Sequence, residues 1–184
     1  AKLDRVAQEI RDRGGRIDVL VGDASVEAEA ARFVAAAEAM GPLALVLHNA
    51  GSNRRDSFLE LRREDFEQLW REHCLGGFLI GREAARAMVP RGKGTILFTG
   101  ASGSLRGKAM FAAFAAAKAA LRAVSQSMAR ELGPKGIHIG HVVIDGGING
   151  QRLLSRMPEL ADKARADGML NTDAIAETYW QIHI

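Results

Sequence analysis

The sequence predicts an α/β protein built on a doubly wound, Rossmann-like parallel sheet. Segments with helical apolar spacing alternate with short apolar runs, such as LALVLHNAG at 43–51 and GTILFTG at 94–100. These runs are apolar on both faces, as is typical of parallel strands that helices cover on each side. The 184 residues contain no linker, repeat or low-complexity tract, so we expect one domain over residues 1–184.

In the first half of the chain, breaks in apolar spacing mark the ends of the elements. Gly14 follows the first helical segment and Gly41 the second, and glycine commonly ends helices. Ser25 is the expected N-cap of the second helix. The expected elements are a helix from Leu3 to Gly14, a strand over 16–23 (RIDVLVGD), a helix over 25–40, a strand over 43–51 and a long helix over 63–89.

The second half continues the alternation. An Ala-rich segment with helical spacing ends at Gly133, which Pro134 follows. The expected elements are a strand over 94–100, a helix over 111–132, a strand over 137–147, a polar and irregular or weakly helical segment over 151–168, and a last helix over 172–183.

Composition excludes several classes of protein. The net charge is only +3, and basic residues alternate with acidic ones, as in RDRGGR and LRREDFEQLWRE, so we expect no nucleic-acid partner. No run approaches 18 apolar residues and the first residues form a charged helix, so we expect neither a membrane span nor a signal peptide. The single Cys74 fits a reducing compartment, and we expect a cytoplasmic protein.

Ligands of open parallel sheets bind beyond the carboxyl ends of the strands. Four such ends carry candidates: Gly22–Asp23, His48–Gly51, Thr99–Ser104 and Asp145–Gly147. TGASGSLRG at 99–107 has two interpretations. As a phosphate-binding loop it is weak, because glycines at gaps of three and four do not give G-x-G-x-x-G. The other interpretation places a catalytic helix after it, at FAAFAAAK.

The order of these motifs resembles the short-chain dehydrogenase/reductase family, in an atypical branch. The resemblance covers essentially the whole chain. Its motifs are GDA at 22–24, HNAG at 48–51, GTILFTGAS at 94–102, FAAFAAAK at 111–118, in the place of Y-x-x-x-K, and ARELGPKGIHIGHVVIDGG at 129–147, with Asp145 in place of a proline.

The resemblance implies hydride transfer between NAD or NADP and a carbonyl or alcohol carbon of a small-molecule substrate. It places Lys118 in the lysine position, which holds the nicotinamide ribose. It places Phe114 in the tyrosine position, Ala101 in the serine position and His73 in the asparagine position. Ser102, next to Ala101, could supply a hydroxyl if the loop shifts, as could the nearby Ser104, although turn-forming serines are common. His73 could act as a replacement acid.

The same resemblance outlines a cofactor groove and implies no metal site. It assigns Asp23 and Ala24 to the adenine, Asn49, Ala50 and Gly51 to the adenosine ribose, Lys118 to the nicotinamide ribose, and Gly146, Gly147 and Ile148 to the nicotinamide amide. The altered catalytic positions leave two hypotheses open. The chain is an oxidoreductase with an atypical active site, or it is a non-catalytic nucleotide-binding or scaffold subunit of the same fold.

The family's glycine-rich phosphate loop has no counterpart in the sequence. We expect its first two strands and its last strand to be missing from this chain, and the natural polypeptide to be longer. Residues 16–23 would then be a strand without its usual neighbour. Because the helices over 63–89 and 111–132 correspond to the pair that forms the family's dimer interface, we expect a homodimer or homotetramer.

Overall fold

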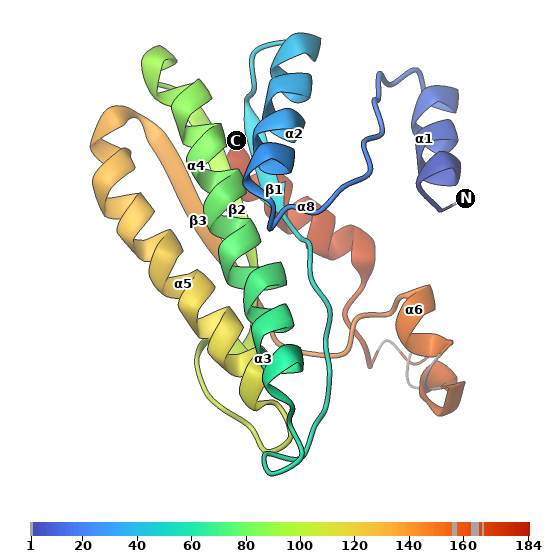
Figure 1. Ribbon diagram of the computed structural model, residues 1–184. Coiled ribbons are helices and arrows are strands. Elements are labelled where there is room, and N and C mark those ends of the chain that lie inside the picture. Colours follow the sequence, from blue (N-terminus) through green and yellow to red (C-terminus); the bar gives the residue numbers. More distant parts are fainter. Residues whose placement is uncertain (1, 156–157, 163–165, 167) are drawn as a thin grey trace.

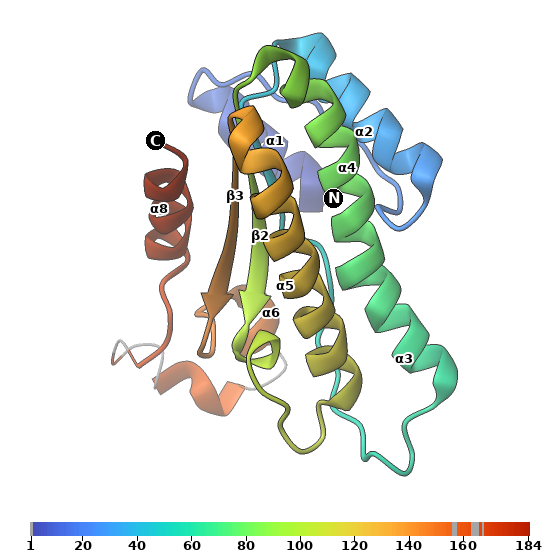
Figure 2. The same cartoon turned by 90° about the vertical axis from the view of Figure 1, so that its left-hand side faces the viewer.

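The computed structural model describes residues 2–155, 158–162, 166 and 168–184 (Figure 1). They form an α/β fold around a parallel sheet of β1 (Leu45–His48), β2 (Gly94–Ala101) and β3 (Ile137–Ile144) in the order β1-β2-β3. The chain returns through a helix between successive strands, as a parallel sheet requires. Figure 2 shows α4 and α5 on one side of the sheet and α8 on the other. The Rossmann-like prediction is therefore confirmed.

The central strand β2 has the most buried side chains because helices cover both of its faces. Ile96, Leu97 and Phe98 are fully buried. Phe98 and Ile96 pack with Met88 of α4 and Leu121 of α5, which form the main core. This arrangement fixes the height of α5 along β2 and hence the place of every side chain on its first turns.

The helices agree with the predicted periodicity. Their bounds are α1 (Lys2–Asp12), α2 (Glu27–Met40), α3 (Arg63–Trp70), α4 (Gly76–Met88), α5 (Ala112–Leu132), α6 (Gln151–Leu154) and α8 (Thr172–His183). The segment predicted as one helix over 63–89 is α3 and α4 joined by a π-helical turn at Arg71–Leu75. Such turns occur frequently at functional sites. Within the described residues, no helix is long and apolar enough to cross a membrane.

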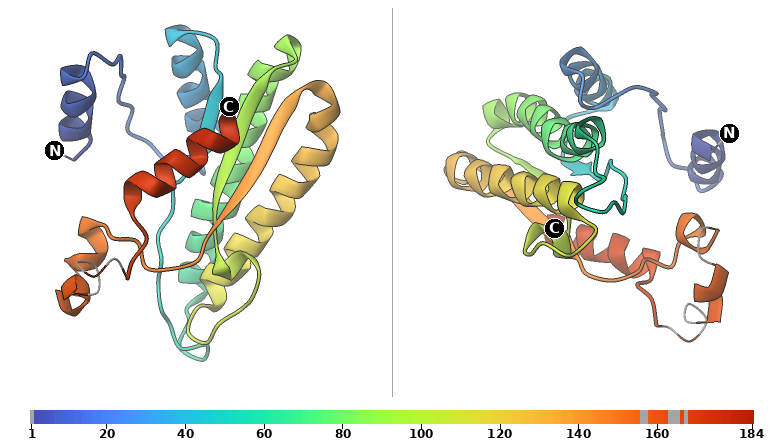
Figure 3. Two further views of the ribbon diagram at one scale, coloured as in Figure 1. Left: turned by 180° about the vertical axis from the view of Figure 1, so that it is seen from behind. Right: turned by 60° about the horizontal axis from the view of Figure 1, so that its bottom comes forward.

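The strand predicted over 16–23 is wrong. These residues form an extended connection with no ladder partner in the described part of the chain, and Val19, Leu20 and Val21 are exposed. Both views of Figure 3 show α1 and this connection set apart from the sheet. A β-branched run becomes a strand only where a neighbouring strand takes up its backbone N–H and C=O groups.

The N-cap predicted at Ser25 is also wrong. The N-cap of α2 is Val26, whose side chain makes no capping bond, and the Ser25 N–H donates to Asp23 Oδ1 at 2.8 Å. Asp23 thus organises the turn before α2. The last helix has a cap that was not predicted, because Asn171 accepts hydrogen bonds from the N–H groups of Asp173 and Ala174. The irregular segment over 151–168 lies partly outside the described residues; its described part contains α6 and a 3-10 turn at Pro158–Leu160.

Candidate active site

Lys118 lies on α5, packed against the carboxyl end of β2. Its side chain is only 5 % exposed, and Nζ donates to the Thr99 carbonyl oxygen at 2.6 Å. No ion pair joins Lys118 to a carboxylate of the described residues. Burial lowers the pKa of Lys118 to about 8, because a charged ammonium loses hydration there. The alanines beside it in the helix allow this close packing.

Phe114 lies one helical turn before Lys118, and the two side chains face the same interior. Lys118 Nζ is 5.9 Å from the centre of the Phe114 ring. The ring also meets His73 edge-on, with centroids 5.5 Å apart. A Cβ on Gly103 would lie 3.2 Å from Phe114 Cδ1, so the loop before α5 passes close over this ring. Phe114 fills its position sterically and has no proton to give.

His73 projects from the π-helical turn into the same interior and is 2 % exposed. Its Nε2 lies 2.8 Å from the Ser52 carbonyl oxygen. A carbonyl oxygen only accepts, so Nε2 carries the hydrogen and Nδ1 keeps a bare lone pair. Nδ1 is buried without a hydrogen-bond partner among the described residues. Burial, together with the Lys118 charge, lowers the pKa of His73 to about 4.

Gly51 makes room for the His73 ring. Gly51 has φ +137°, a conformation that side chains rarely adopt, and a Cβ there would overlap the imidazole. Gly51 therefore follows β1 for a steric reason that is independent of any cofactor.

His48, the last residue of β1 and the first of the HNAG motif, is a second buried imidazole, for which the sequence suggested no separate role. It is 4 % exposed, and its Nε2 has no hydrogen-bond partner in the described part of the structure. Burial lowers its pKa to about 4, and the charges of Lys118 and His73 act in the same direction. Backbone groups of His73 and Glu72 raise the pKa and offset only part of this effect.

His141 of β3 completes the group around Lys118. Ser104 Oγ lies 3.3 Å from His141 Nε2 and accepts the Ala101 N–H at 3.1 Å. A Cβ on Gly100 would overlap the His141 ring. Burial is the main cause that lowers the pKa of His141, and the charges of Lys118 and Arg122 lower it further.

The residues predicted around the serine position therefore have different surroundings. Ala101 stands at the end of β2 with an inert methyl group. Ser102 is half-buried and opens a 3-10 turn in which its carbonyl accepts the N–H groups of Leu105 and Arg106. Ser104 is the serine that reaches a titratable group, His141, and it is 4 % exposed. The structure places Ser102 in the turn role that small polar residues commonly have.

The predicted cofactor residues lie in loops that follow the strands or precede α2. Asn49, Ala50 and Gly51 are exposed directly after β1. Gly146 and Gly147 are exposed after β3, and the exposed Ile148 makes a parallel bridge with Leu170. Asp23 is exposed beside the half-buried Ala24, and hydrogen bonds from Ser25 lower the pKa of its carboxyl.

The free donors and acceptors around Lys118 match the hydrogen-bonding groups of a ribose. An ammonium has three N–H donors, and one of them is taken by Thr99. The bare nitrogens of His73 and His48 are buried acceptors. Hydroxyl groups, which donate and accept, match both sets. Among the described residues, no group of three His, Cys, Asp or Glu side chains is placed to hold a metal ion.

Comparison with known proteins identifies the family. A family model described as short chain dehydrogenase matches residues 1–152. A Hericium erinaceus protein named "Short-chain dehydrogenase/reductase eriH" is 35% identical over 139 residues, which are 74% of this chain and 55% of that protein. A gluconate 5-dehydrogenase of Gluconobacter oxydans is 32% identical over 100 residues, 54% of this chain and 39% of that protein. The chain thus spans about half the length of the first curated relatives it matches.

Solved structures agree. A short-chain dehydrogenase from Rhodopseudomonas palustris superposes with a TM-score of 0.80 at 41% identity, covering 98% of this chain and 74% of that one. A gluconate 5-dehydrogenase from Burkholderia cenocepacia, in complex with NADP and tartrate, gives a TM-score of 0.77 at 25% identity, covering 86% and 62%. Because the family model matches residues 1–152, which are most of this chain, the chain belongs to the short-chain dehydrogenase family.

Proposed function

We propose that this chain carries the catalytic half of an NAD(P)-dependent oxidoreductase. The reaction is hydride transfer between the nicotinamide and a carbonyl or alcohol carbon of a small molecule. The observation that carries the proposal is the buried Lys118, which has spare N–H donors and no carboxylate partner among the described residues at the carboxyl end of β2. Membership of the family and relatives named as dehydrogenases support it.

The predicted residues other than Ser102 have roles in this proposal. The cofactor supplies or accepts the hydride. Lys118 holds the nicotinamide ribose, and His73 Nδ1 accepts a hydrogen bond from a hydroxyl group at the edge of that ribose. Phe114 and Ala101 shape the site without proton chemistry. The residues proposed to line the rest of the groove are Asp23, Ala24, Asn49, Ala50, Gly51, Gly146, Gly147 and Ile148.

Binding of NADPH tests the cofactor site. We expect Lys118→Met to weaken NADPH binding at least about tenfold, because a hydrogen bond from a charged group contributes about 1.5–3 kcal/mol. The measurement is a titration of cofactor fluorescence. Lys93→Met, at an exposed lysine before β2, is the matched control and should leave binding unchanged. Equal affinities of the two variants would contradict the assignment of Lys118.

The second candidate function is a non-catalytic nucleotide-binding or scaffold subunit. The observation in its favour is that Phe114 and Ala101 stand where proton donors are expected. Both functions include cofactor binding, so only turnover separates them. Because one relative and several solved neighbours are named gluconate dehydrogenases, gluconate with NADP is the first substrate pair to assay. A free, buried Cys74 supports a cytoplasmic location.

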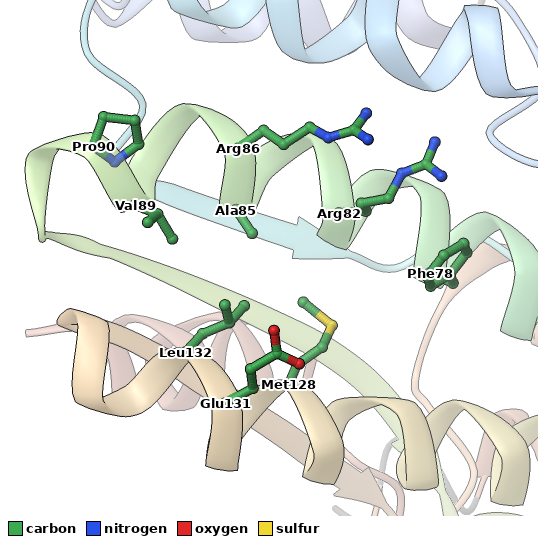
Figure 4. A pocket seen from close by; sticks show the side chains of 9 residues that line it. All are labelled: Phe78, Arg82, Ala85, Arg86, Val89, Pro90, Met128, Glu131 and Leu132. Atoms are coloured by element: carbon green, nitrogen blue, oxygen red, sulfur yellow. The ribbon is translucent and has the colours of Figure 1, made fainter.

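We also propose that α4 and α5 form a homodimer or homotetramer interface. Figure 4 shows the groove between them, of about 380 Å³, with Phe78, Ala85 and Val89 on α4 and the following turn facing Met128 and Leu132 on α5. Phe78 is 39% exposed and lines this groove together with the other apolar side chains named here. We expect Met128→Glu to shift the protein to monomers in sedimentation velocity. An unchanged oligomer would place the interface elsewhere.

A further inference from the structure

Lys118 lies among three imidazoles that come from three different elements. We call Lys118, His48, His73 and His141 the basic cluster. His48 and His141 pair in register with Phe98, one from each neighbouring strand, so both lie at one height across the sheet. His73 enters from the π-helical turn. The Lys118 charge lowers the pKa of all three imidazoles. The Phe114 ring contacts both Lys118 Nζ, at 5.9 Å from its centre, and the His73 ring, with centroids 5.5 Å apart.

The charged groups next to the cluster do not neutralise Lys118. Glu72 lies behind His73 but accepts hydrogen bonds from the Ser52 Oγ at 2.6 Å and from Gln68 at 2.9 Å. Arg122, one turn after Lys118 on α5, adds a further positive charge beside His141. Phe114 and Thr99 contribute an aromatic face and a carbonyl. Burial therefore acts on Lys118 without the carboxylate that would restore a high pKa.

The two kinds of base respond differently at neutral pH. With a pKa of about 4, His73 and His48 are protonated in only about one molecule in a thousand at pH 7, so neither is an effective proton donor. With a pKa of about 8, Lys118 is mostly protonated at pH 7. Its pKa is also close enough to that pH for the ammonium to release its proton. A general acid works best when its pKa lies near the operating pH.

We propose that the Lys118 ammonium is itself the proton donor of the reaction and replaces the hydroxyl that Phe114 lacks. This inference rests on the proposed function. As the carbonyl carbon gains the hydride, the C=O π pair moves to oxygen. That oxygen takes a proton from Nζ, whose N–H bonding pair stays on nitrogen as a neutral amine. In the oxidative direction the neutral amine takes the proton of the alcohol. The Thr99 carbonyl orients the ammonium throughout.

The first test is made on the protein without cofactor or substrate. Lysine labelled with 13C at Cε is followed by NMR from pH 6 to 11, and the Lys118 signal is assigned by its loss in Lys118→Arg. We expect that signal to titrate near pH 8, well below those of exposed lysines such as Lys93. A Lys118 signal that titrates at pH 10 or above would overturn the inference, whatever the enzyme does.

The second test separates proton donation from ribose binding. Arginine keeps the charge and the donors but holds its proton over the whole range. Above pH 8, we expect the rate of NADPH-dependent reduction of keto-gluconate by the wild type to fall about tenfold per pH unit. We expect Lys118→Arg to bind NADPH within a few fold of wild type while its kcat falls about 100-fold or more. A Lys118→Arg enzyme with wild-type kcat and the same alkaline limb would overturn the inference.

The same experiment distinguishes a failure of the proposed oxidoreductase function from a failure of proton donation by Lys118. NADPH binding with turnover that does not depend on Lys118 protonation leaves the proposed function standing and refutes proton donation by Lys118. NADPH binding without turnover also refutes it, in favour of the scaffold function. Absence of NADPH binding contradicts the proposed function and the inference together. His73→Asn is the control variant; it should retain the alkaline limb, because Lys118 and not His73 sets it.

Discussion

Lys118 and the histidines around it share one buried interior, yet burial leaves them in opposite charge states at neutral pH. Desolvation disfavours the charged form of both residue types. An imidazole starts near neutrality and is pushed to a pKa of about 4, so His48 and His73 are neutral. An ammonium starts above 10 and is brought to about 8, so Lys118 keeps its charge. In the same environment, His48 and His73 are therefore neutral and can accept hydrogen bonds, whereas Lys118 is charged and can donate them.

This difference is the basis for proposing Lys118 as the acid in a site without a tyrosine hydroxyl. A buried carboxylate beside Lys118 would hold its proton too tightly for transfer. The structure puts a carbonyl and an aromatic ring there instead. His73, which the sequence suggested as a replacement acid, is better suited to accept a hydrogen bond at Nδ1.

The largest expected effect is a loss of free energy of unfolding at acid pH, caused by protonation of His48 and His73. Their pKa is about 4 in the folded protein and near 6.5 in the unfolded chain. Between these values only the unfolded chain binds the protons, so stability is complete above pH 6.5 and falls as the pH drops towards 4. We expect a loss on the order of 3 kcal/mol per imidazole, measured by urea unfolding at pH 7 and pH 4.5.

Single substitutions separate this effect from general acid unfolding. His48→Asn should reduce the acid-induced loss, and His138→Asn, at an exposed histidine of β3, should not. If both variants lose the same free energy of unfolding between the two pH values as the wild type, the buried imidazoles are not its source.

A smaller effect is expected from filling the space above β2. Gly100→Ala would place a Cβ where the His141 ring lies and push that ring away from Ser104. We expect a loss of about 1–3 kcal/mol in the free energy of unfolding, because the ring must shift and its hydrogen bond is lost. Gly107→Ala is the matched control, since no atom lies within 4 Å of a Cβ there. Equal stability of both variants would contradict the packing of His141 over Gly100.

The smallest effect is expected when the hydroxyl is restored. Phe114→Tyr adds a second proton donor, on a ring whose centre lies 5.9 Å from Lys118 Nζ, which already supplies one in the proposal. If Lys118 serves as the acid, we expect the kcat of NADPH-dependent reduction to rise about tenfold at most. A gain of about 100-fold or more would mean that the wild-type site lacks an acid, since general acid catalysis typically contributes about 10²–10⁴-fold.

The sequence predicted the strands that pair with a neighbour among the described residues, and it failed for the segment that has no such neighbour there. GTILFTG and IHIGHVVI became β2 and β3, which pair along their whole length. RIDVLVGD, of similar composition, stayed unpaired, because strand formation depends on a neighbour that local sequence does not specify. Periodicity was enough for α5 and α8, because a helix satisfies its own hydrogen bonds.

The site was predicted in part for a similar reason. Lys118, Phe114 and His73 followed from motif spacing, and the structure brings them together. The place of His48 and His141 at one height of the sheet was missed, because it comes from strand register, which pairs both with Phe98. Neither the pKa of Lys118 nor the neutrality of the histidines is visible without the packing that removes water.

The most direct test of the account is deuteride transfer. The purified protein is incubated at pH 7 with NADPH deuterated on the transferring face of the nicotinamide and with keto-gluconate, and the product is examined by mass spectrometry. The account predicts deuterium on the reduced carbon, with at least 100-fold less in Lys118→Arg. Bound cofactor with no deuterium in the product would contradict it and make the chain a nucleotide-binding scaffold.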